Sequence, residues 1–123
     1  MSPDSRLGLG RYGEQVAIDY LCRQGYQIKG KNWRCSLGEI DVVAVDGGTL
    51  VFVEVRAKQS DAYGSPEESV ARTKQARLVH LAETYLQWHP WPGGSWRIDV
   101  VAIEFSKEGK VKRLNHIVNA VGG

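Results

Sequence analysis

The sequence predicts a mixed α/β fold in which a central sheet of about five strands is flanked by helices. Two segments carry apolar residues at helical spacing, and shorter segments between and after them are rich in β-branched residues. Their order along the chain is helix, three strands, helix, two strands. Strands joined by short turns and then a helical crossover favour a sheet with both antiparallel and parallel neighbours. A chain of 123 residues suits one domain over residues 1–123.

The first helix is expected over residues 11–24, after a polar stretch, residues 1–10, that we expect to form a flexible arm. The apolar side chains of this helix recur at helical spacing, at Val16, Ala17, Tyr20 and Leu21. Gly25 follows in the place of a C-terminal glycine cap. The segment therefore predicts an amphipathic helix with a defined end.

Three strands are expected next, over residues 26–34, 39–45 and 49–57. The second of them is mostly β-branched, which is typical of an inner strand. The turn Asp46-Gly47-Gly48 separates the second strand from the third, and these residues tolerate positive φ. The second and third strands should therefore form an antiparallel hairpin.

A second helix is expected from Pro66 to about Trp88. Proline suits a first helical position because its missing N–H would have no partner there. Residues 89–94, His-Pro-Trp-Pro-Gly-Gly, end the helix. Two further strands, over residues 96–105 and 111–118, complete the pattern. Three tryptophans near this break could form a platform for stacking bases or, more commonly, a hydrophobic patch that pins the loop: Trp88, Trp91 and Trp96.

The bulk composition excludes several classes of protein. The net charge is only +2, so a nucleic-acid interface would have to rest on local patterning. Two cysteines without ligand spacing and three scattered histidines argue against a disulfide framework and a zinc site. No apolar run reaches membrane-spanning length, and no secretion signal is evident, so we expect no membrane association and a cytoplasmic location.

Carboxylates interrupt the second and third strands. Glu54 shares a strand face with Arg56, and counting back from the hairpin turn places Asp41 opposite Glu54, within one or two positions. Two carboxylates that face each other repel, whereas a divalent cation between them makes the arrangement favourable. Mg²⁺ suits such a site. The alternative is an ordinary Glu54–Arg56 salt bridge with Asp41 near the turn.

The helices add further candidates. Glu14 lies on or beside the helix stripe expected to face the sheet, although a first-turn glutamate also complements the helix dipole. Lys74 begins the inward stripe of the second helix, from which it could extend to solvent or toward a phosphate. Arg72 and Arg77 place further positive charge near Lys74, although arginines on a helix surface are more commonly solvated charges without a binding role. Asp99 interrupts a later strand and is expected to be structural first.

These residues together resemble a known pattern. The segments Gly-Glu-Ile-Asp at 38–41 and Phe-Val-Glu-Val-Arg at 52–56 are similar to the split acidic motif of the PD-(D/E)XK, or restriction-endonuclease-like, nucleases. From about residue 10 to 103, the chain more closely resembles the bacterial YraN-like family. The residues behind this resemblance are Gly13-Glu14, Asn32, Arg34, the two acidic segments, Lys74-Gln75 and the run from Arg97 to Val101.

The resemblance implies a restriction-endonuclease-like fold in which Asp41 and Glu54 hold Mg²⁺ or Mn²⁺, with Glu14 completing the site. Arg56 replaces the usual lysine, and because arginine stays charged it is a poor base. Lys74 could supply the missing amine.

The function expected is a metal-dependent endonuclease that hydrolyses nucleic-acid phosphodiester bonds, with DNA as the expected substrate. The family's distant similarity to archaeal Holliday-junction resolvases suggests branched or structured DNA. Basic side chains would contact the phosphate backbone without reading sequence, among them Arg6, Arg11, Lys29, Lys31 and Arg34. A junction-cutting enzyme would suit a homodimer. The alternatives are a nucleic-acid-binding module of the same fold that does not cut, and a protein-interaction domain.

Overall fold

The computed structural model describes residues 5–60, 64–69 and 72–121, and its elements follow the expected order. Helix α1 (Ser5–Arg23) precedes strands β1 (Gln27–Cys35), β2 (Gly38–Asp46) and β3 (Thr49–Gln59). A 3₁₀ turn, η1 (Pro66–Ser69), and helix α2 (Arg72–Trp88) follow, and then strands β4 (Trp96–Phe105) and β5 (Val111–Ile117). The fold prediction, a mixed sheet flanked by helices and of restriction-endonuclease-like type, is confirmed.

The five strands form one sheet in the order β1-β2-β3-β4-β5. The pair β3–β4 is parallel, while the other three neighbouring pairs are antiparallel. The helical crossover between β3 and β4 is what allows these two strands to run in the same direction. The predicted combination of antiparallel and parallel pairs is therefore present.

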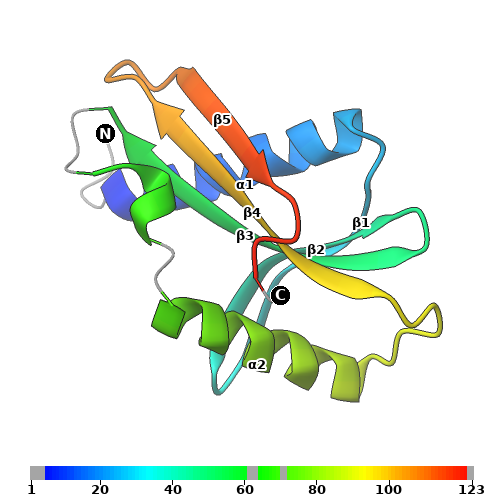
Figure 1. Cartoon of the computed structure of the whole chain (residues 1–123). Coiled ribbons are helices and arrows are strands. Elements are labelled where there is room, and N and C mark those ends of the chain that lie inside the picture. Colours follow the sequence, from blue (N-terminus) through cyan, green and yellow to red (C-terminus); the bar gives the residue numbers. More distant parts are fainter. Residues whose placement is uncertain (1–4, 61–63, 70–71, 122–123) are drawn as a thin grey trace.

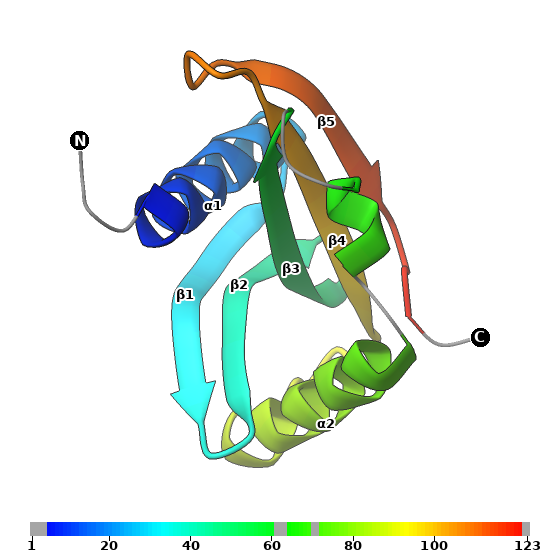
Figure 2. The same cartoon turned by 90° about the vertical axis from the view of Figure 1, so that its left-hand side faces the viewer.

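The two helices cover opposite faces of the sheet (Figures 1 and 2). On one face, Ala17 and Leu21 of α1 pack against Val51 and Val53. On the other, Leu78, Leu81 and Ala82 of α2 pack in a cluster with Leu50 and Phe52. Alternate residues of β3 thus enter different cores, as the two-residue period of a strand requires.

Helix α1 begins at Ser5, so the prediction of a flexible arm over residues 1–10 is wrong for residues 5–10, which are helical. Residues 1–4 lie outside the described part. Propagating a helix adds one hydrogen bond per residue, and a segment anchored by packing can extend through glycines that cost about 1 kcal/mol each. The other end matches the prediction: Gly25 has φ of 91°, and the Tyr26 N–H bonds the Leu21 carbonyl at 3.0 Å.

The expected second helix is divided. Pro66 opens η1, and α2 starts at Arg72, with residues 70–71 outside the described part. A bidentate ion pair joins η1 to β5, because Arg113 donates to both carboxylate oxygens of Glu67 at 2.6 and 3.0 Å.

Among the described helices, none is both long and apolar enough to cross a membrane.

Strands β2 and β3 separate at the position that matters for the site. Their ladder runs from Asp46↔Thr49 to Val42↔Val53 and ends there. Beyond this point β2 continues to pair with β1, and β3 continues to pair with β4. Figure 2 shows β2 diverging from β3 toward α2. The β2–β3 pairing is therefore open directly beyond Val42 and Val53, and we call this break in the ladder the notch.

Candidate active site

Asp41 and Glu54 are the first residues beyond the last paired positions of β2 and β3. The count from the hairpin turn therefore placed them correctly opposite each other. The Val55 N–H donates to Asp41 Oδ2 at 2.8 Å, which bridges the gap where the regular ladder has ended. The Asp41 and Glu54 carboxyl groups are close enough to share a hydrogen bond. Both side chains consequently point into the same notch.

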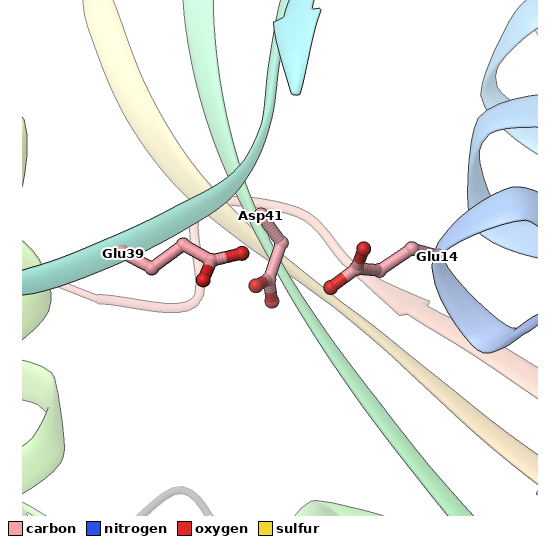
Figure 3. A group of neighbouring side chains, drawn as sticks. All are labelled: Glu14, Glu39 and Asp41. Carbon is pink, nitrogen blue, oxygen red and sulfur yellow. The ribbon is translucent and has the colours of Figure 1, made fainter. Parts of the chain in front are cut away.

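Two more carboxylates reach this notch. Single oxygen atoms of Glu14, Glu39 and Asp41 all lie within 4.8 Å of one another. Figure 3 shows Glu14 projecting from α1 toward Asp41, with Glu39 approaching from the other side. Glu14 therefore faces the sheet, which was one of the two interpretations left open by the sequence. We refer to Glu14, Glu39, Asp41 and Glu54 as the carboxylate cluster.

Gly13 allows α1 to lie close enough for Glu14 to reach the notch. A Cβ added at Gly13 would lie 2.9 Å from the Ala57 Cβ on β3, closer than two such carbons approach in real structures. Only a residue without a side chain fits between α1 and β3 here. Gly13 thus lets α1 pack closely on β3, and Glu14 places its carboxylate in the notch.

Asn32 holds two members of the cluster. Its amide nitrogen donates to Oε1 of Glu14, at 3.0 Å, and to Oε1 of Glu39. Asn32 has φ of 55°, a left-handed conformation that asparagine tolerates better than most residues. A single amide thus brings together carboxylates from a helix and a strand that would otherwise repel each other.

The electrostatics of Asp41 reflect this crowding. Burial, and next the hydrogen bond and charge of Glu54, raise the pKa of Asp41 from 3.8 to about 9. The charge of Glu14 acts in the same direction, while the hydrogen bond from Val55 opposes it. Asp41 therefore binds a proton at neutral pH when no cation is present.

Two arginines border the cluster. Arg56 donates from one terminal nitrogen to Glu54 Oε2 at 3.2 Å, so the same-face ion pair that the sequence offered as an alternative interpretation is present. The Arg56 Nε is buried, yet it has no acceptor among the described residues. Arg34 Nε lies 3.1 Å from Glu39 Oε2, and the Arg34 side chain is otherwise exposed. Arg56 thus retains one buried donor for an oxygen that the described residues do not provide.

A small cleft lies beside three of the four carboxylates. Its free space is about 10 Å³, roughly that of one water-sized sphere. Carboxylate and apolar side chains line it together: Glu39, Asp41 and Glu54 with Ile40, Phe52, Val53, Leu78 and Ile98. Its ionisable ligand atoms are all oxygens, which suits Mg²⁺ or Mn²⁺ better than zinc or copper.

The other predicted site residues are placed less completely. Arg72 and Lys74 lie in the first turn of α2, and their side chains lie outside the described part. Arg6 lies in α1, and its side chain is likewise not described. The remaining basic residues are all exposed, on α1, β1 or α2: Arg11, Lys29, Lys31, Arg34 and Arg77.

Asp99 has the structural role that was expected first. It is fully buried and accepts hydrogen bonds from Arg97 Nε at 2.9 Å and from the Asn119 N–H at 2.9 Å. His116 Nε2 lies 2.8 Å from its other oxygen. This network joins β4 to β5 and the segment that follows, on the sheet face opposite α2.

Glu39 and Asn32 were not among the residues predicted to form the site. Glu39 shares a strand face with Asp41, and that alternation could have identified it. Asn32 gave a weaker signal, because its side-chain contacts depend on a positive φ that the sequence does not indicate.

Known proteins similar to this chain agree on one family. Residues 13–103 match the model of a family described as "Uncharacterised protein family UPF0102". A UPF0102 protein of Pelotomaculum thermopropionicum is 47% identical over 117 residues, covering 95% of this chain and 98% of the relative. UPF0102 proteins of Roseiflexus castenholzii and Chloroflexus aurantiacus are each 44% identical, covering 94% and 98% of this chain and the same shares of their own lengths. The matched segment spans Glu14, the notch and most of β4, and the chain belongs to the UPF0102 family, the YraN-like family that its sequence resembles.

Proposed function

We propose that this protein is a divalent-metal-dependent endonuclease that hydrolyses phosphodiester bonds in nucleic acid, with DNA as the favoured substrate. The observation behind the proposal is the convergence of the carboxylate cluster where β2 and β3 separate. Four carboxylates within one partly buried notch repel one another, as the raised pKa of Asp41 reflects. A doubly charged cation would convert that repulsion into attraction.

Asp41 and Glu54 would bind the cation, because they share the notch and line the cleft. Glu14 and Glu39 would complete the shell, directly or through water, as Mg²⁺ usually retains several waters. When bound, the ion would polarise the phosphate and lower the pKa of a water molecule near it. Asp41 must lose its proton to bind, so the affinity for metal should rise with pH.

Arg56 would contact the phosphate. Its Nε is buried without an acceptor among the described residues, and leaving a buried donor unsatisfied costs about 1–3 kcal/mol. A phosphate oxygen would satisfy it and would gain a charge-assisted hydrogen bond. Because the guanidinium stays protonated, Arg56 stabilises negative charge on the phosphate and does not act as a base.

The remaining basic residues would hold the nucleic acid by its backbone. Lys31 and Arg34 are exposed on β1, the strand next to β2, and Arg11 lies one turn before Glu14 on α1. Lys74 lies in the first turn of α2, the helix that borders the cleft through Leu78. We propose that Lys74 provides a further phosphate contact.

Strand cleavage tests the proposal. The purified protein should cut labelled branched or linear DNA with Mg²⁺ or Mn²⁺, and the cutting should stop with EDTA. Glu54→Gln keeps the size of the side chain and removes the charge, so it should lower the rate at least 100-fold while leaving the fold intact. Glu83→Gln makes the same change on the exposed surface of α2 and should cut like the wild type.

A non-catalytic nucleic-acid-binding module is the second candidate, because arginine stands where the PD-(D/E)XK nucleases that the sequence resembles have lysine. Salt-dependent binding in both wild type and Glu54→Gln, with no cleavage by either, would favour this module and overturn the nuclease proposal. Failure to bind any nucleic acid at low salt would instead favour a protein-interaction domain, since phosphate contacts are strongest there.

A further inference from the structure

An open aromatic groove lies beside the carboxylate cluster. It has about 370 Å³ of free space and is lined by the end of β1 and the end of α2: Trp33, Arg34, Cys35, Trp88 and His89. Tyr85 supports two of the rings that form its inner wall, because its ring centroid lies 5.3 Å from that of Trp33 and 4.7 Å from that of His89. This wall is fixed by its packing on the core, because Trp33 and Tyr85 also contact the α2-side cluster.

The outer wall of the groove is Trp88, whose residue surface is 74% exposed. The sequence left two roles open for the tryptophans around the break, and the structure divides them. Trp91 and Trp96 pack against the core and pin the loop. Trp88 instead presents a large aromatic surface to solvent at the edge of the groove.

The groove and the carboxylate cluster share a boundary. Arg34 lines the groove, and its Nε lies 3.1 Å from Oε2 of Glu39, a member of the cluster. The β1–β2 register also pairs Trp33 with Ile40 and Arg34 with Glu39, so the groove begins one strand away from the cleft. A nucleic-acid strand with a phosphate at the cluster would therefore pass Arg34 before reaching the aromatic rings.

We propose that this groove binds an unstacked base of the substrate, next to the phosphodiester held at the carboxylate cluster. The inference rests on the proposed function and narrows its substrate to nucleic acid with an unpaired nucleotide, such as a single strand, flap or branch. Aromatic faces stack on any base and so bind without reading sequence. The planar guanidinium of Arg34 is suited to a phosphate or to a second stacking contact.

Charge selects a nucleic acid over an apolar peptide as the occupant. The side chain that joins the groove to the cluster is a cation, and Lys31, another exposed cation, lies on the same strand. Bases inside a continuous duplex are stacked on each other and do not offer a free face to Trp88. The groove should therefore distinguish unpaired from paired nucleotides.

Metal-free binding tests the inference apart from catalysis. In EDTA, fluorescence anisotropy should show that Trp88→Ala weakens binding of a short labelled single strand by roughly 5- to 150-fold, the range expected for one lost base stack. Trp88→Phe should retain most of the affinity. Binding of a blunt duplex of the same sequence should be unchanged by Trp88→Ala, and an abasic strand should bind wild type as weakly as the intact strand binds Trp88→Ala.

Val111→Ser is the matched control, because it removes another exposed apolar side chain on β5 without touching the groove. Circular dichroism should show that each variant is folded, since Trp88 is mostly exposed. Equal affinities of wild type and Trp88→Ala for the single strand would overturn the inference, and cleavage measured separately with Mg²⁺ would then still support the nuclease. Binding that depends on Trp88 but is not accompanied by cleavage would support base binding in the groove and contradict the nuclease proposal.

Discussion

Replacing Asp41 by asparagine should stabilise the metal-free protein. Burial and neighbouring carboxylates raise the pKa of Asp41 from 3.8 to about 9, so the folded chain holds one extra proton between about pH 4 and pH 9. Stability therefore falls as pH rises through this window, by at most about 1.4 kcal/mol per pH unit. Because pH 7 lies about three units above 3.8, the stability that Asp41 has lost by pH 7 is at most about 4 kcal/mol. An asparagine side chain at this position would avoid this cost and could still accept the Val55 N–H.

Urea unfolding in EDTA at several pH values measures the effect. The difference in unfolding free energy between Asp41→Asn and wild type should be near zero at pH 4 and should grow as pH rises toward 9. Asp19→Asn is the control, because Asp19 is an exposed aspartate on α1, and its effect should stay within about 0.5 kcal/mol. An Asp41→Asn protein that is less stable than wild type at pH 7, or a difference that does not change with pH, would refute the reasoning.

Three other changes test the surroundings of the site. Gly13→Ala should destabilise the protein by about 1–3 kcal/mol in urea unfolding, because the added Cβ would lie 2.9 Å from that of Ala57. Adding Ala57→Gly to the same chain should restore part of the lost stability. Asn32→Gly keeps the left-handed backbone but removes the amide that joins Glu14 and Glu39, so calorimetry should show Mn²⁺ affinity about tenfold lower with an unchanged circular dichroism spectrum. Asp99→Asn should lower the unfolding free energy by about 3 kcal/mol or more, because Arg97 would lose its buried ion-pair partner. Asp46 is the more exposed partner of Arg97, so Asp46→Asn should lower it by less than about 1 kcal/mol. Equal losses for the two aspartates would contradict the role assigned to burial.

Much of the fold was predictable because local signals agreed with one another. The Asp-Gly-Gly turn fixed the β2–β3 register, and from that register followed the placement of Asp41 opposite Glu54. The two-residue period of a strand also accounts for Val51 and Val53 entering one core and Phe52 the other. Such features depend on contacts near in sequence or on strict alternation, which a single sequence displays.

The remainder depends on contacts distant in sequence. Asn32 joins Glu14, 18 positions earlier in the chain, to Glu39 through a backbone conformation that no local pattern indicates. The early start of α1 was missed because Gly8 and Gly10 resemble loop residues when packing is unknown. The groove was also hidden, because Trp33 and Trp88 are brought together only by the curl of β1 and β2 toward α2.

Calorimetric titration with Mn²⁺ at pH 7, repeated in two buffers with different ionisation enthalpies, tests the central claim most directly. The dependence of the measured heat on buffer gives the number of protons released on binding. If the carboxylate cluster is the metal site, wild type should release about one proton per ion, and Asp41→Asn should bind far more weakly and release none. Absence of Mn²⁺ binding by wild type, or equally tight binding by Asp41→Asn, would contradict the account.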